Sequence, residues 1–309
     1  MELKIRTELP ASLEDVPASA LLDELGGPTL FDLRQPGRAP LFVSVLLHGN
    51  EDSGWNAVRR LRPRLAEASA LVFVGNVEAA RARRRSLPGR VDFNRVWEGG
   101  DTPEAAVAGE VADFAAAACP RLAVDVHNNT GENPPYAVLA RTDPPTLALA
   151  RAFSERAMLA TQPRGFQTRR FARFCPAVTV EVGTVRDPAS TERAASFLAR
   201  LLDGAPPERD GATLSLFVTA ARVTLDPEAE LEPDMQRYNF RPAPAGTALT
   251  RSGGLTAWAD DGSDASGEFF ALQDGAAVLK RPTVLAMYTG DPESARLDCL
   301  CYFLEPIEP

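Results

Sequence analysis

The sequence predicts an α/β protein with a mostly parallel sheet flanked by helices, followed by a smaller, mainly β C-terminal domain. Over roughly the first two-thirds of the 309 residues, short apolar runs alternate with longer segments of helical periodicity. Strands and helices alternate in this way when helical crossovers join parallel strands. A cluster of Pro, Gly and Asp at 203–211 then marks a boundary. We therefore expect one domain at 1–205 and a second at 206–309.

Five short apolar runs of the first domain are predicted strands. They are rich in Val, Leu and Phe, and runs of this length are typical of strands that are buried on both faces of a sheet. The predicted strands are 41–47, 71–75, 122–126, 136–140 and 177–182.

Four longer segments of the first domain are predicted helices. Asp143 precedes one of them as an N-cap, and Gly204 follows another, where helices commonly end. Pro63 indicates a break inside a third, because proline lacks the N–H that a helix interior needs. The predicted helices are 54–68, 103–118, 144–159 and 191–202.

The region after residue 211 has a different character. Its apolar segments are short, are separated by Pro, Gly and Asp, and show little helical periodicity. They include 214–225, 277–288 and 300–305. This pattern predicts the small, mainly β domain.

Charge and composition exclude several classes of partner. The formal net charge of −9 would repel a phosphate backbone, so we expect a small-molecule partner and no nucleic acid. No uncharged run approaches the ~20 residues that span a bilayer, and the N-terminal segment lacks the apolar core of a signal peptide. We therefore expect a cytoplasmic protein without a membrane segment. Its oligomeric state stays open, a homo-oligomer included.

The four cysteines predict neither a disulfide framework nor a thiolate zinc site. They are few for a chain of this length and include no Cys-x-x-Cys pair. Buried or incidental thiols are the simplest interpretation.

Both histidines of the chain stand at the ends of predicted strands. His48 follows the run 41–47 with Glu51 three residues later, and His127 closes the run 122–126. The carboxyl ends of parallel strands meet at one edge of a sheet, where ligands bind. Two His and one Glu form a typical catalytic zinc set, which leaves a fourth position open for water. Taken alone, His-x-x-Glu is a weak motif, and His48 would then simply follow a strand end.

Two acidic residues belong to the same predicted edge. Asp125 lies two residues before His127, on the same face of the strand, and is either a partner for an imidazole or a structural carboxylate. Glu181 lies among Val residues in the run 177–182. An apolar setting raises the pKa of a carboxyl and suits a general acid or base. The alternative for Glu181 is a pair with a nearby arginine.

An arginine-rich stretch lies between the two histidines. Asn94 and Arg95 follow Arg81, Arg83, Arg84 and Arg85 along the chain. Guanidinium groups bind carboxylates through two parallel hydrogen bonds, and a neighbouring amide adds a donor. These residues predict an anchor for an acidic substrate, whereas Arg81, Arg83 and Arg84 are better explained as a solvated basic loop.

Four motifs in order resemble the succinylglutamate desuccinylase/aspartoacylase family, which is related to the zinc carboxypeptidases. They are HGNE at 48–51, DFNR at 92–95, DVHNNT at 125–130 and VEVG at 180–183, and the resemblance spans about 40–185. The resemblance implies a zinc carboxypeptidase-like fold and one zinc ion per chain, held by His48, Glu51 and His127. It further implies that Glu181 activates the attacking water.

The resemblance also implies a substrate-binding set. Asn94 and Arg95 would hold the substrate's carboxylate, and Arg85 would polarise the scissile carbonyl. An arginine for a carboxylate on the acyl side would be Arg170, with Arg169 and Arg173 as competitors. Tyr288 of the C-terminal domain would match a substrate-binding tyrosine or be a core residue.

The function that follows is zinc-dependent hydrolysis of the amide bond of an N-acyl amino acid. Four alternatives remain open at this stage. The same site would serve a metallocarboxypeptidase that acts on short peptides with a free carboxylate, a deacetylase or an esterase. A non-catalytic zinc-binding protein would retain the metal without hydrolysis.

Overall fold

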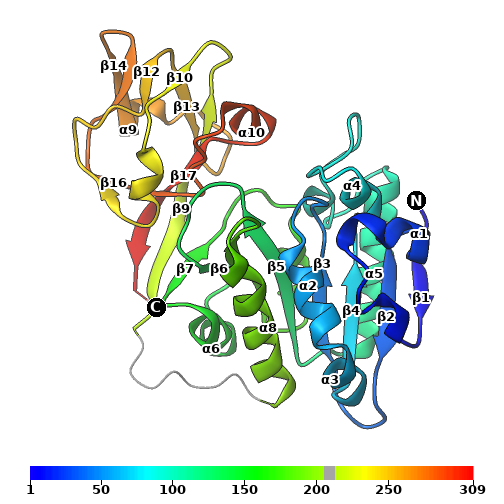
Figure 1. Ribbon diagram of the computed structural model, residues 1–309. Coiled ribbons are helices and arrows are strands. Elements are labelled where there is room, and N and C mark those ends of the chain that lie inside the picture. Colours follow the sequence, from blue (N-terminus) through cyan, green and yellow to red (C-terminus); the bar gives the residue numbers. More distant parts are fainter. Residues whose placement is uncertain (205–212, 309) are drawn as a thin grey trace. The chain divides into compact units, whose positions relative to one another are not determined.

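The computed structural model describes residues 1–204 and 213–308, which form two compact units (Figure 1). The first comprises Met1–Asn128, Tyr136–Ala157 and Pro163–Leu214. The second comprises Asn129–Pro135, Met158–Gln162 and Ser215–Pro309. The sequence does not predict the two short segments from the middle of the chain that belong to the second unit. The predicted boundary between 205 and 206 lies outside the described residues.

The first unit contains a largely parallel sheet, as predicted. Parallel pairing joins β1 to β2, β3 to β4 and β3 to β5, whereas β2 pairs antiparallel with β4 and β6 with β8. The sequence does not predict β1 and β2. The strands in spatial order are β1 (Lys4–Arg6), β2 (Thr29–Leu33), β4 (Ala70–Val74), β3 (Leu41–Val45), β5 (Leu122–Asn129), β8 (Ala177–Thr184) and β6 (Tyr136–Leu139).

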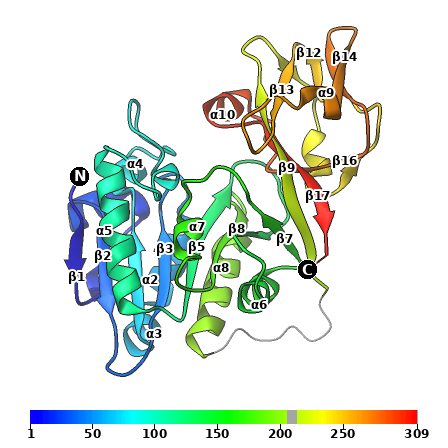
Figure 2. The ribbon, with the colours of Figure 1, turned by 180° about the vertical axis from the view of Figure 1, so that it is seen from behind.

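Helices cover both faces of this sheet. Figure 1 shows α2 (Ser53–Arg60) and α8 (Pro188–Leu202) on one face, and Figure 2 shows α5 (Pro103–Ala118) on the other. No helix among the described residues is both long enough and apolar enough to cross a membrane. The shorter elements are η1 (Ala11–Leu13), η2 (Ala18–Ala20), α1 (Leu21–Leu25), α3 (Arg62–Glu67), α4 (Val77–Arg81), η3 (Phe93–Arg95), α6 (Pro144–Phe153) and α7 (Gln167–Phe171).

Two of the predicted helices differ from the structure. The segment 54–68 forms two helices, α2 and α3. Pro63 lies in the first turn of α3, where a backbone N–H would have no hydrogen-bond partner within the helix in any case. The prediction of helix at 144–159 is wrong beyond Phe153. There α6 ends and β7 (Arg156–Leu159) begins, because backbone pairing and burial override the helical preference of its Ala, Met and Leu.

An aromatic cluster holds the DFNR segment against the sheet. The ring of Trp97 lies 6.1 Å from Phe73 of β4, 6.2 Å from Phe93 of η3 and 5.8 Å from Phe171 of α7, measured between ring centroids. All four side chains are buried. The sheet, η3 and α7 therefore share one core, so packing sets the positions of η3 and α7.

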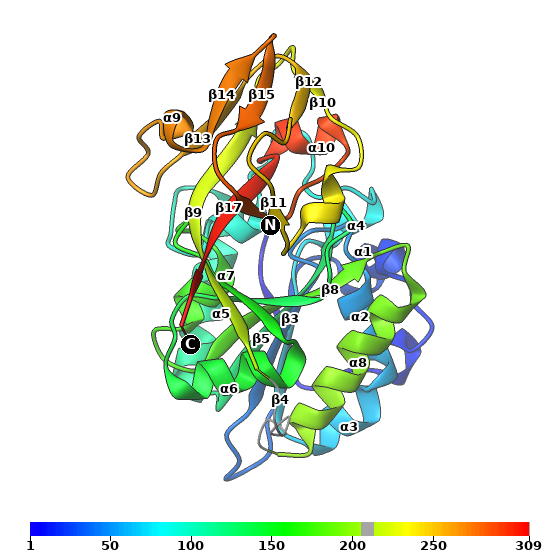
Figure 3. The ribbon, with the colours of Figure 1, turned by 90° about the vertical axis from the view of Figure 1, so that its left-hand side faces the viewer.

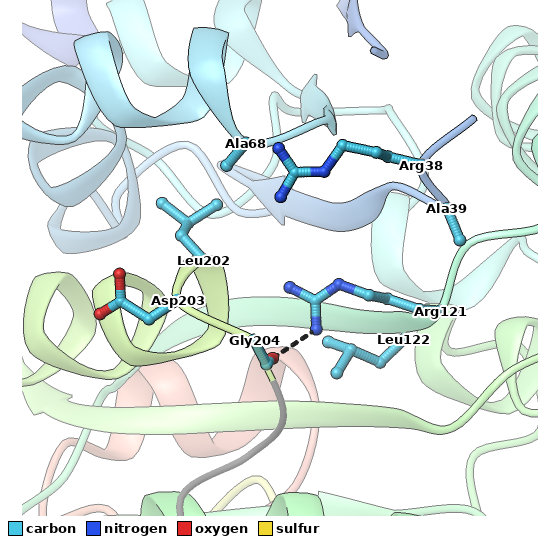
Figure 4. A pocket seen from close by; sticks show the side chains of 8 residues that line it. All are labelled: Arg38, Ala39, Ala68, Arg121, Leu122, Leu202, Asp203 and Gly204. Atoms are coloured by element: carbon cyan, nitrogen blue, oxygen red, sulfur yellow. Dashed lines mark hydrogen bonds between the residues drawn. The ribbon is translucent and has the colours of Figure 1, made fainter. Parts of the chain in front are cut away.

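A cavity of about 520 Å³ lies at the amino end of β3 and β5, the edge opposite His48 and His127 (Figure 4). Arg121, which lines it, donates hydrogen bonds to the carbonyl oxygens of Gly204, at 2.8 Å, and Leu201. Arginine at a helix C-terminus satisfies carbonyl groups that have no partner within the helix. Arg121 thus caps the C-terminus of α8, and this cavity brings together none of the predicted site residues.

The second unit is mainly β, as predicted, and Figure 3 shows its strands. β17 (Cys301–Ile307) pairs with β9 (Ser215–Leu225) and β16 (Thr283–Ala286), and β14 (Phe270–Gln273) forms a hairpin with β15 (Ala276–Leu279). The remaining elements are β10 (Glu230–Leu231), η4 (Met235–Tyr238), β11 (Pro242–Ala243), β12 (Thr250–Ser252), β13 (Leu255–Trp258), α9 (Ser266–Phe269) and α10 (Pro292–Leu297).

Candidate metal centre and active site

His48, Glu51 and His127 form one buried cluster. β3 and β5 are parallel neighbours, so the segments at their carboxyl ends meet. The Nδ1 atom of His48 lies 2.8 Å from Oε1 of Glu51, and Nδ1 of His127 lies 2.8 Å from Oε2 of the same carboxylate. The two Nδ1 atoms are 3.1 Å apart. The structure therefore brings together the three residues that the sequence predicts as metal ligands.

The turn that carries His48 and Glu51 depends on close backbone packing. The N–H of Glu51 donates to the carbonyl oxygen of His48 at 3.2 Å, which turns both side chains toward the same point. Gly49 lies between them, and a Cβ at this position would overlap the peptide between Ala79 and Ala80 in α4. Glycine is therefore required here for a close approach of two backbone segments.

The outward nitrogen of each imidazole is hydrogen-bonded to a carboxylate. Nε2 of His48 lies 3.1 Å from Oδ1 of Asp92, and Nε2 of His127 lies 2.7 Å from Oδ2 of Asp125. Carboxylates accept from a ring N–H and thereby leave the other nitrogen as a lone-pair donor. The buried hydroxyl of Ser44 donates to the second oxygen of Asp125 at 2.8 Å. Both Nδ1 atoms thus face the cluster with a lone pair that a metal ion could use.

Charge separation within the cluster shifts its pKa values. Burial alone would raise the pKa of Glu51, but the two imidazoles outweigh it and hold that pKa below its usual range. Burial would likewise lower the pKa of His127, but Asp125 and Glu51 raise it well above the ordinary value. For Asp92, His48 and Arg85 overcome the effect of burial and hold the pKa well below its usual range.

These donors fit a divalent ion of the zinc type. Two imidazole nitrogens and one carboxylate are the typical protein ligands of catalytic zinc, at about 2.0–2.2 Å. Ligands at that distance around a tetrahedral ion lie roughly 3.3 Å apart. The separations of 2.8 to 3.1 Å in the cluster are a few tenths of an ångström shorter, so small side-chain movements would accommodate the ion. Among the described residues, no other group of His, Cys, Asp and Glu has this arrangement.

Glu181 lies on β8 with its side chain buried. Its Oε2 atom has no hydrogen-bond partner among the described residues. Burial raises the pKa of Glu181 to about 7, and the charges of His127 and Glu51 also act on it. A buried carboxyl whose pKa lies near neutrality can both accept and donate a proton. Its chemistry therefore fits the predicted role of a general base.

Arg85 points into the cluster, whereas its neighbours do not. Its Nε donates to Oδ2 of Asp92 at 2.9 Å, and its Nη1 lies 4.0 Å from Oε1 of Glu51. Arg83 and Arg84 are exposed, in keeping with their interpretation as a solvated loop. Asp92 is thus shared by His48 and Arg85, which fixes one guanidinium next to the candidate metal ligands.

The amide of Asn94 has a defined orientation. Its Oδ1 accepts the backbone N–H of Gln167 at 2.8 Å, and its Nδ2 lies 3.3 Å from Nε2 of His127. That ring nitrogen carries a proton when it donates to Asp125, so it cannot also accept from Asn94. The hydrogens of Nδ2 are therefore available to another acceptor. Arg95 is tied to the same segment, because its Nη1 donates to the carbonyl oxygen of Asn94 at 2.9 Å.

Arg170 and Tyr288 are the two remaining predicted substrate residues. Arg170 contacts the exposed Asp113 of α5 at 3.4 Å, and Arg173 is paired with Glu98. Gln167 and Phe171 form the buried face of α7, one helical turn apart, so Arg170 points away from that face. Tyr288 belongs to the second unit, where its ring is buried and its hydroxyl has no hydrogen-bond partner among the described residues. Substrate contacts by Arg170 and Tyr288 stay predictions.

Sequence reasoning missed three residues that support the cluster. Asp92 and Ser44 act on the histidines as described above. Asn128 donates its backbone N–H to Oε2 of Glu51 at 3.1 Å and its side-chain amide to the carbonyl oxygen of Gly183 at 2.8 Å. The sequence signals are that Asp92 and Asn128 lie inside the DFNR and DVHNNT motifs and that Ser44 is a polar residue within the apolar run 41–47.

The comparison with family models supports the same site. Residues 40–204 match the model described as the succinylglutamate desuccinylase/aspartoacylase catalytic domain, a segment that includes every cluster residue. Among curated protein sequences, none matches this chain well enough to count as a relative.

Solved structures share the fold. The succinylglutamate desuccinylase from Chromobacterium violaceum has a TM-score of 0.65 at 19% identity, covering 92% of this chain and 89% of its own. Murine aminoacylase 3 has a TM-score of 0.62 at 17% identity and covers 89% and 97%. The product-bound ectoine utilization protein from Ruegeria pomeroyi has a TM-score of 0.59 at 19% identity and covers 91% and 88%.

Proposed function

Because this chain belongs to the succinylglutamate desuccinylase/aspartoacylase family, we propose that it is a zinc-dependent hydrolase that cleaves the amide bond of an N-acyl amino acid. The observation that carries the proposal is the convergence of two Nδ1 atoms and the Glu51 carboxylate in one buried cluster. Each imidazole has its outward nitrogen bonded to a carboxylate, an arrangement typical of metal-binding histidines.

Substrate binding is assigned to three side chains. Asn94 offers amide hydrogens and Arg95 a guanidinium to the carboxylate of the amino-acid part, which has only acceptor atoms. Arg85 lies within 4.0 Å of Glu51 and is held by Asp92, so it supplies a fixed positive charge to the carbonyl oxygen as that oxygen becomes negative.

His48, Glu51 and His127 would hold the zinc ion, which supplies a Lewis acid for the scissile carbonyl and lowers the pKa of water when bound. Glu181 takes a proton from the attacking water at Oε2, the atom without a partner, and then returns it to the leaving amine nitrogen. The raised pKa of Glu181 suits both transfers, because the carboxyl is neither fully ionised nor fully protonated near neutral pH.

The test is an amine-release assay with zinc-loaded protein. The substrates are N-acetyl-, N-succinyl- and N-formyl-amino acids, with short peptides in parallel, each with and without a chelator. We expect chelator-sensitive cleavage of at least one acyl-amino acid. Cleavage of peptides alone would indicate a metallocarboxypeptidase instead, and bound zinc without any turnover would indicate a binding protein.

A further inference from the structure

The amide of Asn94 is held from outside its own segment. Its Oδ1 accepts the backbone N–H of Gln167, at 2.8 Å, and both residues are buried. A buried amide with its oxygen already engaged has one preferred orientation, in which Nδ2 points the opposite way. The group that sets this orientation is a main-chain N–H located 73 residues further along the chain.

The backbone around Gln167 packs directly against the backbone around Asn94. The N–H of Trp97 donates to the carbonyl oxygen of Gly165 at 3.0 Å. A Cβ on Gly165 would overlap the carbonyl oxygen of Arg95. Two hydrogen bonds and one direct backbone contact therefore join residues 165–167, here called the clasp segment, to residues 94–97.

Aromatic packing holds the clasp segment in place. Gln167 is the first residue of α7, and Phe171 at the end of α7 packs against Trp97 with ring centroids 5.8 Å apart. Phe171 also lies 4.3 Å from Phe42 of β3, again between centroids. The N–H of Gln167 is thus fixed relative to the sheet that carries the metal ligands.

We propose that the clasp segment positions the carboxylate-binding residues, and that the Gln167 N–H orients the Asn94 amide as a hydrogen-bond donor to the substrate. Gln167 is a positioning residue, because it acts through Asn94. This inference rests on the proposed function and narrows its substrate class. A site oriented as a donor accepts a free carboxylate and rejects a carboxamide, whose NH₂ group would leave donors facing each other.

Gln167→Pro removes this one N–H with little change to the backbone. Proline is well tolerated as the first residue of a helix, and the preceding residue, Phe166, already has the extended conformation that proline requires, with φ −85° and ψ 151°. The matched control is Gln167→Ala, which removes the same side chain and keeps the N–H.

We expect Gln167→Pro to raise KM for the acyl-amino acid about fivefold to tenfold, the usual effect of losing one hydrogen bond. Its kcat and zinc affinity should stay within about threefold of the wild-type values, and Gln167→Ala should match the wild type in all three. The preference for a free carboxylate over the carboxamide should fall only in the proline variant. Equal effects in the two variants, or an unchanged KM in Gln167→Pro, would overturn the inference.

Gly165→Ala provides a second, independent variant if the proline variant does not fold. Its new methyl group would displace the Arg95 carbonyl, so KM should rise while zinc affinity holds. Gly109→Ala is the matched control, because a Cβ on Gly109 in α5 meets no atom within 4 Å. Indistinguishable KM values for these two alanine variants would count against the clasp segment.

A readout without turnover separates this inference from the proposed function. The NMR order parameter of the Asn94 side-chain amide should fall in Gln167→Pro and not in Gln167→Ala, whatever reaction the protein catalyses. An unchanged order parameter in the proline variant would refute the positioning role even if acyl-amino acids are cleaved. Failure to cleave any acyl-amino acid, with the order parameter responding as expected, would refute only the proposed function.

Discussion

Oδ2 of Asp125 lies 2.7 Å from Nε2 of His127, while Oδ1 of the same carboxylate accepts the hydroxyl of Ser44 at 2.8 Å. Asp125 and Ser44 are fully buried on adjacent strands, β5 and β3. The chain of contacts therefore runs from Ser44 in the sheet to His127, a candidate metal ligand. It determines which nitrogen of His127 carries the proton.

Asp125→Asn should weaken zinc binding about 10- to 100-fold, because the amide no longer holds the ring with a charged acceptor. Ser44→Ala should have a smaller effect in the same direction, since it removes only the bond that orients Asp125. Competition with a chromogenic chelator measures both. Asp113→Asn, at an exposed carboxylate, is the control, and equal zinc affinities for Asp125→Asn and this control would contradict the prediction.

Glu181→Gln should retain zinc affinity within about threefold and lose at least about a hundredfold in kcat, the usual contribution of a general base. Glutamine keeps the shape of the side chain but cannot take up a proton. Metal analysis and steady-state kinetics on the same preparation test both parts. Full turnover in this variant would exclude Glu181 as the base.

Arg95→Ala and Arg170→Ala should have very different effects on KM for the acyl-amino acid. Removing Arg95 should raise KM by about 10- to 100-fold, the effect expected when a charged hydrogen bond to substrate is lost. Arg170 is engaged by the exposed Asp113 of α5 instead of facing the cluster, so from this arrangement its removal should change KM less than about twofold. Kinetics with one acyl-amino acid compare the two, and a large KM effect for Arg170→Ala would show that its side chain reaches the substrate.

The cysteines should differ in reactivity toward iodoacetamide. Cys119 is exposed at the end of α5, whereas Cys175 is buried, and burial raises its pKa to about 12. At pH 8 the thiolate form of Cys175 is therefore scarce, and its alkylation should be much slower than that of the exposed Cys119. Peptide mass spectrometry after timed alkylation of the native protein measures both rates. Comparable rates would contradict the burial of Cys175, and unfolding in denaturant should make them equal.

The strand ends that carry His48, His127 and Glu181 were predictable from the sequence. His48 follows an apolar run, His127 closes one and Glu181 lies near the end of a third, and parallel strands bring such ends to one edge of a sheet. The largely parallel sheet, the mainly β region after residue 211 and the helix at Pro103–Ala118 agree with the structure for the same reason. Local hydrophobic patterns determine these features, and every residue needed to detect them is close in sequence.

Other features depend on contacts that no local pattern encodes. His48 meets Asp92 across 44 residues, and Asn94 meets Gln167 across 73. Phe171 packs into the aromatic core, which sets the face of α7 that is buried. Arg170 therefore points away from that face. β7 forms where helical propensity predicts a continued helix, since backbone pairing and burial prevail over propensity.

The sequence by itself therefore determined the α/β architecture, the three metal-ligand candidates and the candidate base, because these depend on residue type and position along single strands. The tertiary structure alone decided which nitrogen of each histidine faces the cluster, which arginine points into it and how the Asn94 amide is oriented. Those properties depend on hydrogen bonds between segments far apart in the chain, and only the folded packing brings such partners within reach.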